Sequence, residues 1–306
     1  MIKNKNKTGL FLALVYGISF LAAGIFYLSG GRLDRTEGVV FAVLYMFFPL
    51  ISALIVEKLI HREEIQKPLL ISFRLNRWFL VSWLLPPLII LGSIWISLLF
   101  PGISWSPGME GMFERYEEMM TSEQIEELRK SFEELPFHPA LLSLLSGLLA
   151  GITVNAVAAF GEELGWRAFL VRRFQDMNFI HASLLTGLIW GLWHAPMILM
   201  GHNYPNYPVA GIFMMIIMTV LFSPLFLYIT IKTGSVIAAS VMHGTLNAVA
   251  GLSILMIKGG SELTVGITGV AGFLSILLFT VLFYLYDSFI SREKIMTGAI
   301  NRFLKE

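Results

Sequence analysis

The sequence predicts an all-α integral membrane protein with eight transmembrane helices and with both termini in the cytoplasm. Of its 306 residues, 56% are hydrophobic and only 14% are charged, whereas a soluble domain has about 25% charged residues. Its apolar runs reach the ~20 residues that a helix needs to cross a bilayer. Basic residues are concentrated in alternate connections between these runs, as expected for a multi-pass protein.

The eight apolar runs define the expected spans. Turn residues and charges separate them, and several contain a proline, which a membrane helix tolerates when neighbouring groups satisfy the carbonyls it leaves unpaired. The spans are expected at roughly 9–30, 38–57, 78–100, 140–165, 180–200, 208–231, 235–257 and 265–287.

Basic residues set the expected orientation, because lysine and arginine in short connections stay on the cytoplasmic side. With eight spans, both termini lie on the cytoplasmic side. In a prokaryotic cell the membrane would be the plasma membrane. The run 9–30 is longer than the apolar region of a cleaved signal peptide, so we interpret it as a retained first span. The residues on the cytoplasmic side are Lys3, Lys5, Lys7, Lys58, Arg62, Lys67, Arg74, Arg77, Arg172, Arg173, Lys232, Arg292, Lys294, Arg302 and Lys305.

The connection 101–138 is acidic and is expected outside the cell. It carries nine glutamates against Arg115, Arg129 and Lys130. Thr121 and Gln124 have the spacing of a capping box at a helix start. A short amphipathic helix should follow, serving as a solvated connector or as a lid, with its apolar face formed by Ile125, Leu128, Phe132 and Leu135.

Composition also excludes several classes of function. The chain has no cysteine, so disulfides, thiolate metal ligands and a cysteine nucleophile are ruled out. Its net charge of +1 argues against a nucleic-acid partner. We find no internal repeat and expect residues 1–306 to form a single membrane domain whose oligomeric state the sequence leaves open.

Two adjacent carboxylates, Glu162 and Glu163, stand in the apolar stretch "AAFGEELGWRAFL". A charged side chain at mid-bilayer costs about 2.5–3.5 kcal/mol, so each needs a partner or a use. Arg167 lies four residues after Glu163 and shares its helix face, so it can neutralise that carboxylate. Glu162 points about 100° away from Glu163 and is left for chemistry.

Two further spans carry histidines, His194 in "GLIWGLWHAP" and His243 in "SVMHGTLNA". Counted at about 1.5 Å per residue, Glu162, His194 and His243 lie roughly 15, 20 and 13 Å from the cytoplasmic ends of their helices. We therefore expect them to meet in a pocket open to the cytoplasmic half of the bilayer. Polar stripes at helical spacing accompany both histidines, formed by Thr186, Trp190 and His194 and by Ser240, His243 and Asn247.

This set of side chains supports two hydrolytic mechanisms. A carboxylate with a histidine can activate water as a general base, while a second histidine and an asparagine amide can stabilise an oxyanion. Alternatively, Glu162, His194 and His243 are the three ligands of a catalytic zinc site. Each histidine alone could be no more than an interhelical hydrogen-bonding residue, but three helices converging at similar depth favour a site.

Other intramembrane hydrolases are not matched, because the chain has no HExxH, GxGD or GxSG motif. Instead, "EELGWR" resembles the EExxxR signature of the CPBP family, "WGLWH" its FxxxH signature with Trp190 in place of phenylalanine, and "HGTLN" its HxxxN/D signature. This family groups type II CAAX prenyl endopeptidases with bacteriocin-processing and self-immunity proteins. The resemblance covers a catalytic core at about 140–250.

The resemblance implies an eight-helix intramembrane peptidase fold with its site in a cavity opening to the cytoplasmic leaflet. By position, Glu162 would be the water-activating base assisted by His194, and His243 with Asn247 would form the oxyanion hole. Glu163 and Arg167 would be structural or substrate-binding, and Trp190 would affect cavity shape or substrate. Members are commonly described as metalloproteases, so the resemblance leaves zinc or a metal-free, glutamate-dependent mechanism as alternatives.

We therefore expect an intramembrane endopeptidase that cleaves near the C-terminus of a prenylated or otherwise membrane-associated peptide or protein, in contact with membrane lipids. The alternative of a different class is an immunity protein that binds a peptide or lipid without cutting it. A transporter with the buried carboxylate as a proton relay is the third hypothesis, although the inverted repeats typical of transporters are not found.

Overall fold

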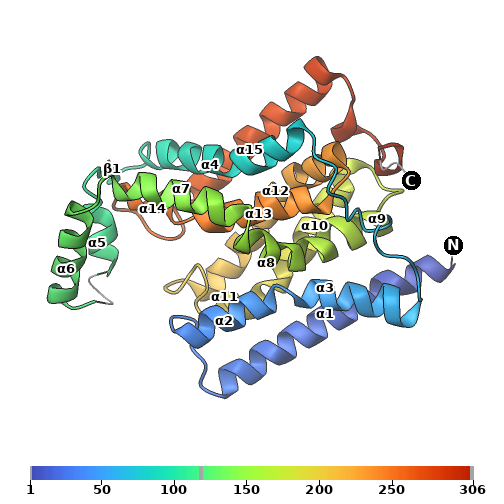
Figure 1. Ribbon diagram of the computed structural model, residues 1–306, viewed down its shortest axis with the longest axis horizontal. Coiled ribbons are helices and arrows are strands. Elements are labelled where there is room, and N and C mark those ends of the chain that lie inside the picture. The colour runs from blue at the N-terminus through green and yellow to red at the C-terminus, as the bar shows by residue number, and fades with distance from the viewer. Residues whose placement is uncertain (1, 117–119, 304–306) are drawn as a thin grey trace.

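The computed structural model describes residues 2–116 and 120–303 as a helical bundle (Figure 1). Both chain ends lie at one end of the bundle, and the acidic connection lies at the other. The described strands β1 (Ser104–Trp105) and β2 (Ile257–Lys258) pair antiparallel. The protein is thus predominantly helical, as the sequence predicts; Glu117, Glu118 and Lys305 lie outside the described residues.

Six helices within the described ranges are long and apolar enough to cross a membrane. They correspond to the first, second, third, sixth, seventh and eighth predicted spans. The second contains a π-helical turn, as does the eighth. They are α1 (Ile2–Leu28); α2 (Thr36–Tyr45) with α3 (Phe48–Leu54) and η1 (Ile55–Ile60); α4 (Arg77–Ser97); α12 (Pro208–Thr233); α13 (Val236–Val249) with α14 (Leu252–Leu255); and α15 (Val270–Leu285) with η3 (Tyr286–Ser291).

The fourth predicted span is a broken helix. Helix α7 (Pro139–Gly151) and the stretch Val154–Arg173 meet at 53° and count as a seventh span if taken together. This stretch consists of α8 (Val154–Glu163), the π-helical η2 (Leu164–Leu170) and α9 (Val171–Arg173). The apolar run gives no sign of the bend, because hydrophobicity is unchanged across it.

The fifth predicted span is α10 (Phe179–Trp193), which has 15 residues and is followed, after His194, by α11 (Ala195–Leu199). It is apolar but shorter than the other spans. Eight spans, and the cytoplasmic location of the termini, therefore stay predictions.

Close backbone contact between α13 and α8 fixes the centre of the bundle. A Cβ atom added to Gly244 would lie 2.5 Å from the backbone nitrogen of Ala156. Small residues allow membrane helices to approach in this way. Because α8 ends in the two glutamates and α13 carries His243, this contact brings their side chains together.

The acidic connection forms α5 (Glu110–Tyr116) and α6 (Ser122–Glu133), and the predicted capping box of Thr121 and Gln124 is present. Ile125 is buried in a small apolar cluster against which Leu128 and Phe132 pack, whereas Leu135 is exposed. Arg115 ties α5 to β2 by donating hydrogen bonds to the carbonyl oxygens of Ile257 and Gly259. The extracellular location of this connection stays a prediction.

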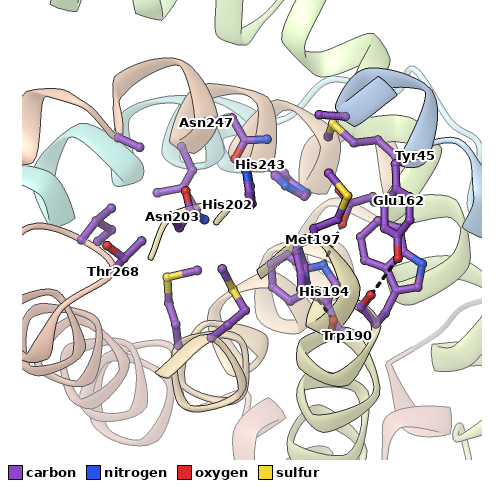
Figure 2. A pocket seen from close by; sticks show the side chains of 18 residues that line it. Tyr45, Glu162, Trp190, His194, Met197, His202, Asn203, His243, Asn247 and Thr268 are labelled. Atoms are coloured by element: carbon purple, nitrogen blue, oxygen red, sulfur yellow. Dashed lines mark hydrogen bonds between the residues drawn. The ribbon is translucent and has the colours of Figure 1, made fainter. Parts of the chain in front are cut away.

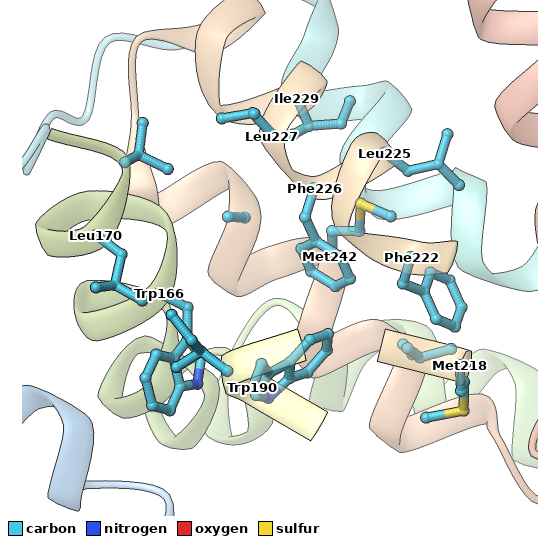
Figure 3. Packing of buried hydrophobic residues seen from close by; sticks show 14 of the residues in the cluster. Trp166, Leu170, Trp190, Met218, Phe222, Leu225, Phe226, Leu227, Ile229 and Met242 are labelled. Carbon is cyan, nitrogen blue, oxygen red and sulfur yellow. The ribbon is translucent and has the colours of Figure 1, made fainter. Parts of the chain in front are cut away.

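The end of the bundle that carries the termini is densely packed. Aromatic and aliphatic side chains of η2, α12 and α13 interlock there, among them Trp166, Leu170, Phe226 and Met242 (Figure 3). The segment after α15 folds across this end through η4 (Ile295–Thr297) and η5 (Ile300–Arg302).

Candidate active site

A cavity of about 300 Å³ lies between α2, α8, α10, α11, α12 and α13 (Figure 2). The structure places all four predicted catalytic side chains in its lining, from two helices and the turn after α10. Glu162 ends α8, His194 follows α10, and His243 and Asn247 lie one turn apart on α13. Sequence positions up to 85 residues apart thus meet in one place.

Glu162 is held by two indole groups. Its side chain is only 3% exposed. Its Oε2 atom accepts hydrogen bonds from Nε1 of Trp190 at 2.7 Å and from Nε1 of Trp166 at 3.4 Å. Because both indoles bind the same oxygen, Oε1 remains to contact water or substrate in the cavity.

Glu163 is fully buried and faces away from the cavity. The predicted pairing with Arg167 is present, with Nε of Arg167 3.4 Å from Oε2 of Glu163. Oε1 of Glu163 also lies 2.7 Å from Nδ1 of His243. Glu163 therefore connects Arg167 to His243 and sets the orientation of that imidazole, a link that sequence spacing within one helix does not reveal.

Arg167 is 1% exposed and sits between two aromatic rings. Its Cζ atom lies 4.3 Å from the ring centroid of Trp190 and 4.5 Å from that of Phe226. Its Nη2 also donates to Oγ of Ser223 at 3.3 Å. Cation–π contacts of this kind strengthen when the cation is removed from water, so they compensate part of the cost of burying the guanidinium.

His194 has a defined tautomer. Its Nδ1 lies 2.9 Å from the backbone oxygen of Trp190. A carbonyl oxygen only accepts hydrogen bonds, so Nδ1 carries the proton of the neutral ring and Nε2 keeps a lone pair. This leaves Nε2 of His194 as a hydrogen-bond acceptor for water in the cavity.

Trp190 contacts Glu162, Arg167, His194 and His243. Its ring centroid lies 5.8 Å from that of His194 and 5.4 Å from that of His243. Its indole N–H donates to Glu162, which the phenylalanine of the family signature could not do. Tryptophan at this position thus supplies a hydrogen-bond donor to the carboxylate of Glu162.

The charges of the cluster can cancel. Glu162 and Glu163 carry two negative charges against the single positive charge of Arg167. If His243 holds a second proton, the four groups sum to zero, which is the arrangement that a buried ionic cluster favours. His243 would then donate from Nδ1 to Glu163 and present Nε2–H to the cavity.

The lining residues that the sequence did not single out include Tyr45, His202, Asn203 and Thr268. The hydroxyl of Tyr45 donates to the backbone oxygen of Trp193 at 3.0 Å and so braces the turn that presents His194. His202 and Asn203 belong to the stretch "GHNYPNYP", a polar connection between two spans, and this polarity was the signal that the sequence offered.

The geometry does not fit the zinc hypothesis. Across residues 2–116 and 120–303, no three His, Cys, Asp or Glu side chains are grouped so as to hold a metal ion. We therefore derive no catalytic step through a metal.

Comparison with known proteins agrees with this arrangement. Residues 132–249 match the family model of the Rce1-like type II CAAX prenyl endopeptidases. The match covers fewer than half of the 306 residues. The chain is also 41% identical over 49 residues to "CAAX prenyl protease 2" of Methanococcus maripaludis. That alignment spans 16% of this chain and only 18% of the relative's length.

The matched region of the family model includes the whole set of site residues from Glu162 to Asn247. Together with the apolar helices, it identifies the chain as an integral, multi-pass membrane protein.

Proposed function

We propose that this chain is an intramembrane endopeptidase of the CPBP family that hydrolyses a peptide bond with water activated by Glu162. The observation that carries the proposal is the cavity in which a carboxylate anchored through one oxygen lies with two imidazoles and a carboxamide. A structural hydrogen-bonding role does not require these groups to line an open space.

The reaction follows from the donors and acceptors available. Oε1 of Glu162 takes a proton from water while Nε2 of His194 accepts the water's other hydrogen as a hydrogen bond. The water oxygen bonds to the carbonyl carbon, and the C=O π electrons move to oxygen. Nε2–H of His243 and the amide of Asn247 donate to this oxyanion, for which one good donor contributes about 2.7–4 kcal/mol.

Collapse of the tetrahedral intermediate breaks the C–N bond. Glu162 returns its proton to the departing nitrogen, so the immediate products are an amine and a carboxylic acid. The acid then becomes a carboxylate by giving its remaining proton to Nε2 of His194 or to water. Glu163 and Arg167 do not contact the reacting atoms in this scheme. They position His243 and supply the charge balance that lets it carry two protons.

The substrate proposed is a membrane-associated peptide, for which the printed name of the archaeal relative makes a prenylated peptide the first to test. Apolar side chains of Met197, Met215, Met218 and Leu246 line the cavity beside the polar groups. They would bury an apolar side chain or lipid chain next to the scissile bond, at about 25 cal/mol per Å² of apolar surface.

The test is cleavage of a fluorogenic prenylated peptide by the purified protein in detergent, with the unprenylated peptide and a Glu162→Gln variant in parallel. The proposal expects cleavage by the wild type that a strong chelator does not reduce, and none by the variant. Tight binding of peptide without cleavage would instead support the non-catalytic binding protein.

A further inference from the structure

The cavity is open and polar on one side, called the rim below, and is closed on the other side. Figure 2 shows Glu162 and Thr268 at opposite sides of the cavity, with His243 and His202 between them. Exposure follows the same order, since Glu162 and His243 are buried whereas Asn247 and Asn203 are exposed. The opening therefore lies at the connections 200–207 and 256–269.

A packed layer, defined as η2 with Phe222, Phe226 and Ile229 of α12, closes the other side. All seven residues of η2 are buried, and the three α12 side chains have no exposed surface. Figure 3 shows Trp166 and Leu170 on one side of this layer and Phe226 and Ile229 on the other. An interior packed at this density has no path wide enough for a peptide.

The segment after α15 covers the packed layer from outside. The backbone oxygen of Gly298 accepts from Phe179 N, and the nitrogens of Ile300 and Asn301 donate to the oxygens of Met177 and Gln175. Ile295, Met296 and Ile300 of this segment are themselves buried against the bundle. The end of the bundle that holds the chain termini is therefore closed by two successive layers.

The closed end is also the basic end. It carries Lys7, Lys58, Arg62, Lys67, Arg74, Arg77, Arg172, Arg173, Lys232, Arg292, Lys294 and Arg302. The end with the cavity opening carries the acidic connection of α5 and α6. Since basic residues in short connections remain cytoplasmic, the opening faces the other side of the membrane.

We propose that the cavity is entered from the extracytoplasmic side, and that the substrate is a peptide segment displayed at that face, such as part of an exported or outward-facing membrane-anchored protein. This inference rests on the proposed function. It differs from the sequence-based expectation of a cytoplasmic opening. Counting residues placed the site near mid-bilayer but could not say which side of it was closed.

The rim has the chemistry to hold an extended peptide. Asn203, Asn247 and the hydroxyl of Thr268 offer donors and acceptors to a peptide backbone. The connections that carry Asn203 and Thr268 are fixed to one another, because Tyr204 donates from its hydroxyl to the backbone oxygen of Thr268 at 2.7 Å. Asn206 likewise donates from Nδ2 to Oε1 of Glu262 at 2.6 Å. The opening is thus a preformed polar rim.

The natural absence of cysteine makes a labelling experiment direct. Single cysteines are introduced as Thr268→Cys at the rim, Glu127→Cys on exposed α6 and Glu64→Cys at the exposed basic end. Each is exposed to a membrane-impermeant maleimide in intact cells and in inverted membrane vesicles. Asn203→Cys is a second rim position in case Thr268→Cys does not accumulate in the membrane.

The proposal expects the rim cysteine and Glu127→Cys to react in intact cells, and Glu64→Cys to react only in inverted vesicles. Labelling of the rim from the same side as Glu64→Cys, labelling of the rim from neither side, or labelling of Glu64→Cys in intact cells would each overturn it. Cleavage in detergent, where both faces are accessible, tests hydrolysis separately, so the two proposals fail in distinguishable ways.

Discussion

A buried glutamate has different surroundings at the two ends of the bundle. At the basic end it is ion-paired, whereas towards the end bearing the acidic connection it lines a cavity. Glu163 faces the packed layer, is 0% exposed and bonds to His243 and Arg167. Glu162, its neighbour in sequence, lines the cavity and leaves one oxygen for a ligand. The boundary between the packed basic end and the open cavity passes between two adjacent carboxylates: Glu163 is held in an ion pair, whereas Glu162 lines the cavity.

A substitution in the packed layer at the basic end should cause the largest loss of stability. Arg167→Met leaves Glu163 buried without its cation, and breaking a buried ion pair in this way costs about 3–5 kcal/mol. The variant should show a much lower thermal midpoint in detergent and no activity. Its matched control is Arg172→Met on the exposed face of α9, where a change of less than about 0.5 kcal/mol is expected. Equal midpoints for the two variants would contradict the boundary described above.

A substitution in the cavity lining should reduce catalysis without reducing stability. Asn247→Leu removes a proposed oxyanion donor, so turnover should fall by about 10²–10³-fold. Affinity should change little, since such a donor acts mainly in the transition state. Comparison of kcat with peptide binding separates these effects. Loss of binding with normal turnover of bound substrate would make Asn247 a substrate-holding residue.

Trp190 lies on the boundary and should show an intermediate effect. Trp190→Phe restores the family's aromatic but removes the N–H that donates to Glu162, a hydrogen bond to a charged group worth about 1.5–3 kcal/mol. Turnover should fall by about ten- to a hundredfold while the thermal midpoint changes less than in Arg167→Met. An unchanged kcat would show that anchoring of Oε2 is unnecessary.

The contact between α13 and α8 gives the smallest of the four expected effects. Gly244→Ala places a methyl group against backbone of α8 and should cost about 1–3 kcal/mol as overpacking, moving His243 relative to Glu162. Gly251→Ala meets no atom within 4 Å and is the matched control. Similar midpoints and activities for the two variants would argue against a precise helix contact.

Much of this arrangement could be predicted from the sequence, because membrane burial makes polar residues conspicuous. Long apolar runs placed the helices, and the cost of carboxylates in hydrocarbon singled out Glu162 and Glu163. Spacing within one helix was sufficient to pair Glu163 with Arg167. These inferences succeed since each depends on a single helix or on energetics that apply to the whole chain.

The features that escaped prediction depend on contacts between distant segments. The 53° bend before α8 occurs within an apolar run of uniform character. The bond between Glu163 and His243 joins residues 80 positions apart. The closure of the basic end depends on η2 and on the segment after α15 packing together, and neither segment shows this in its own pattern.

The most direct test of the account is the rate of peptide cleavage by wild-type protein and by Glu162→Gln, measured in detergent with the thermal midpoint of each. Glutamine retains an oxygen that can accept from Trp190 and Trp166, so the fold should persist while the base is lost. The account predicts equal midpoints within about 1 kcal/mol of stability and cleavage reduced at least about 10³-fold. A stable Glu162→Gln protein that cleaves at the wild-type rate would contradict it.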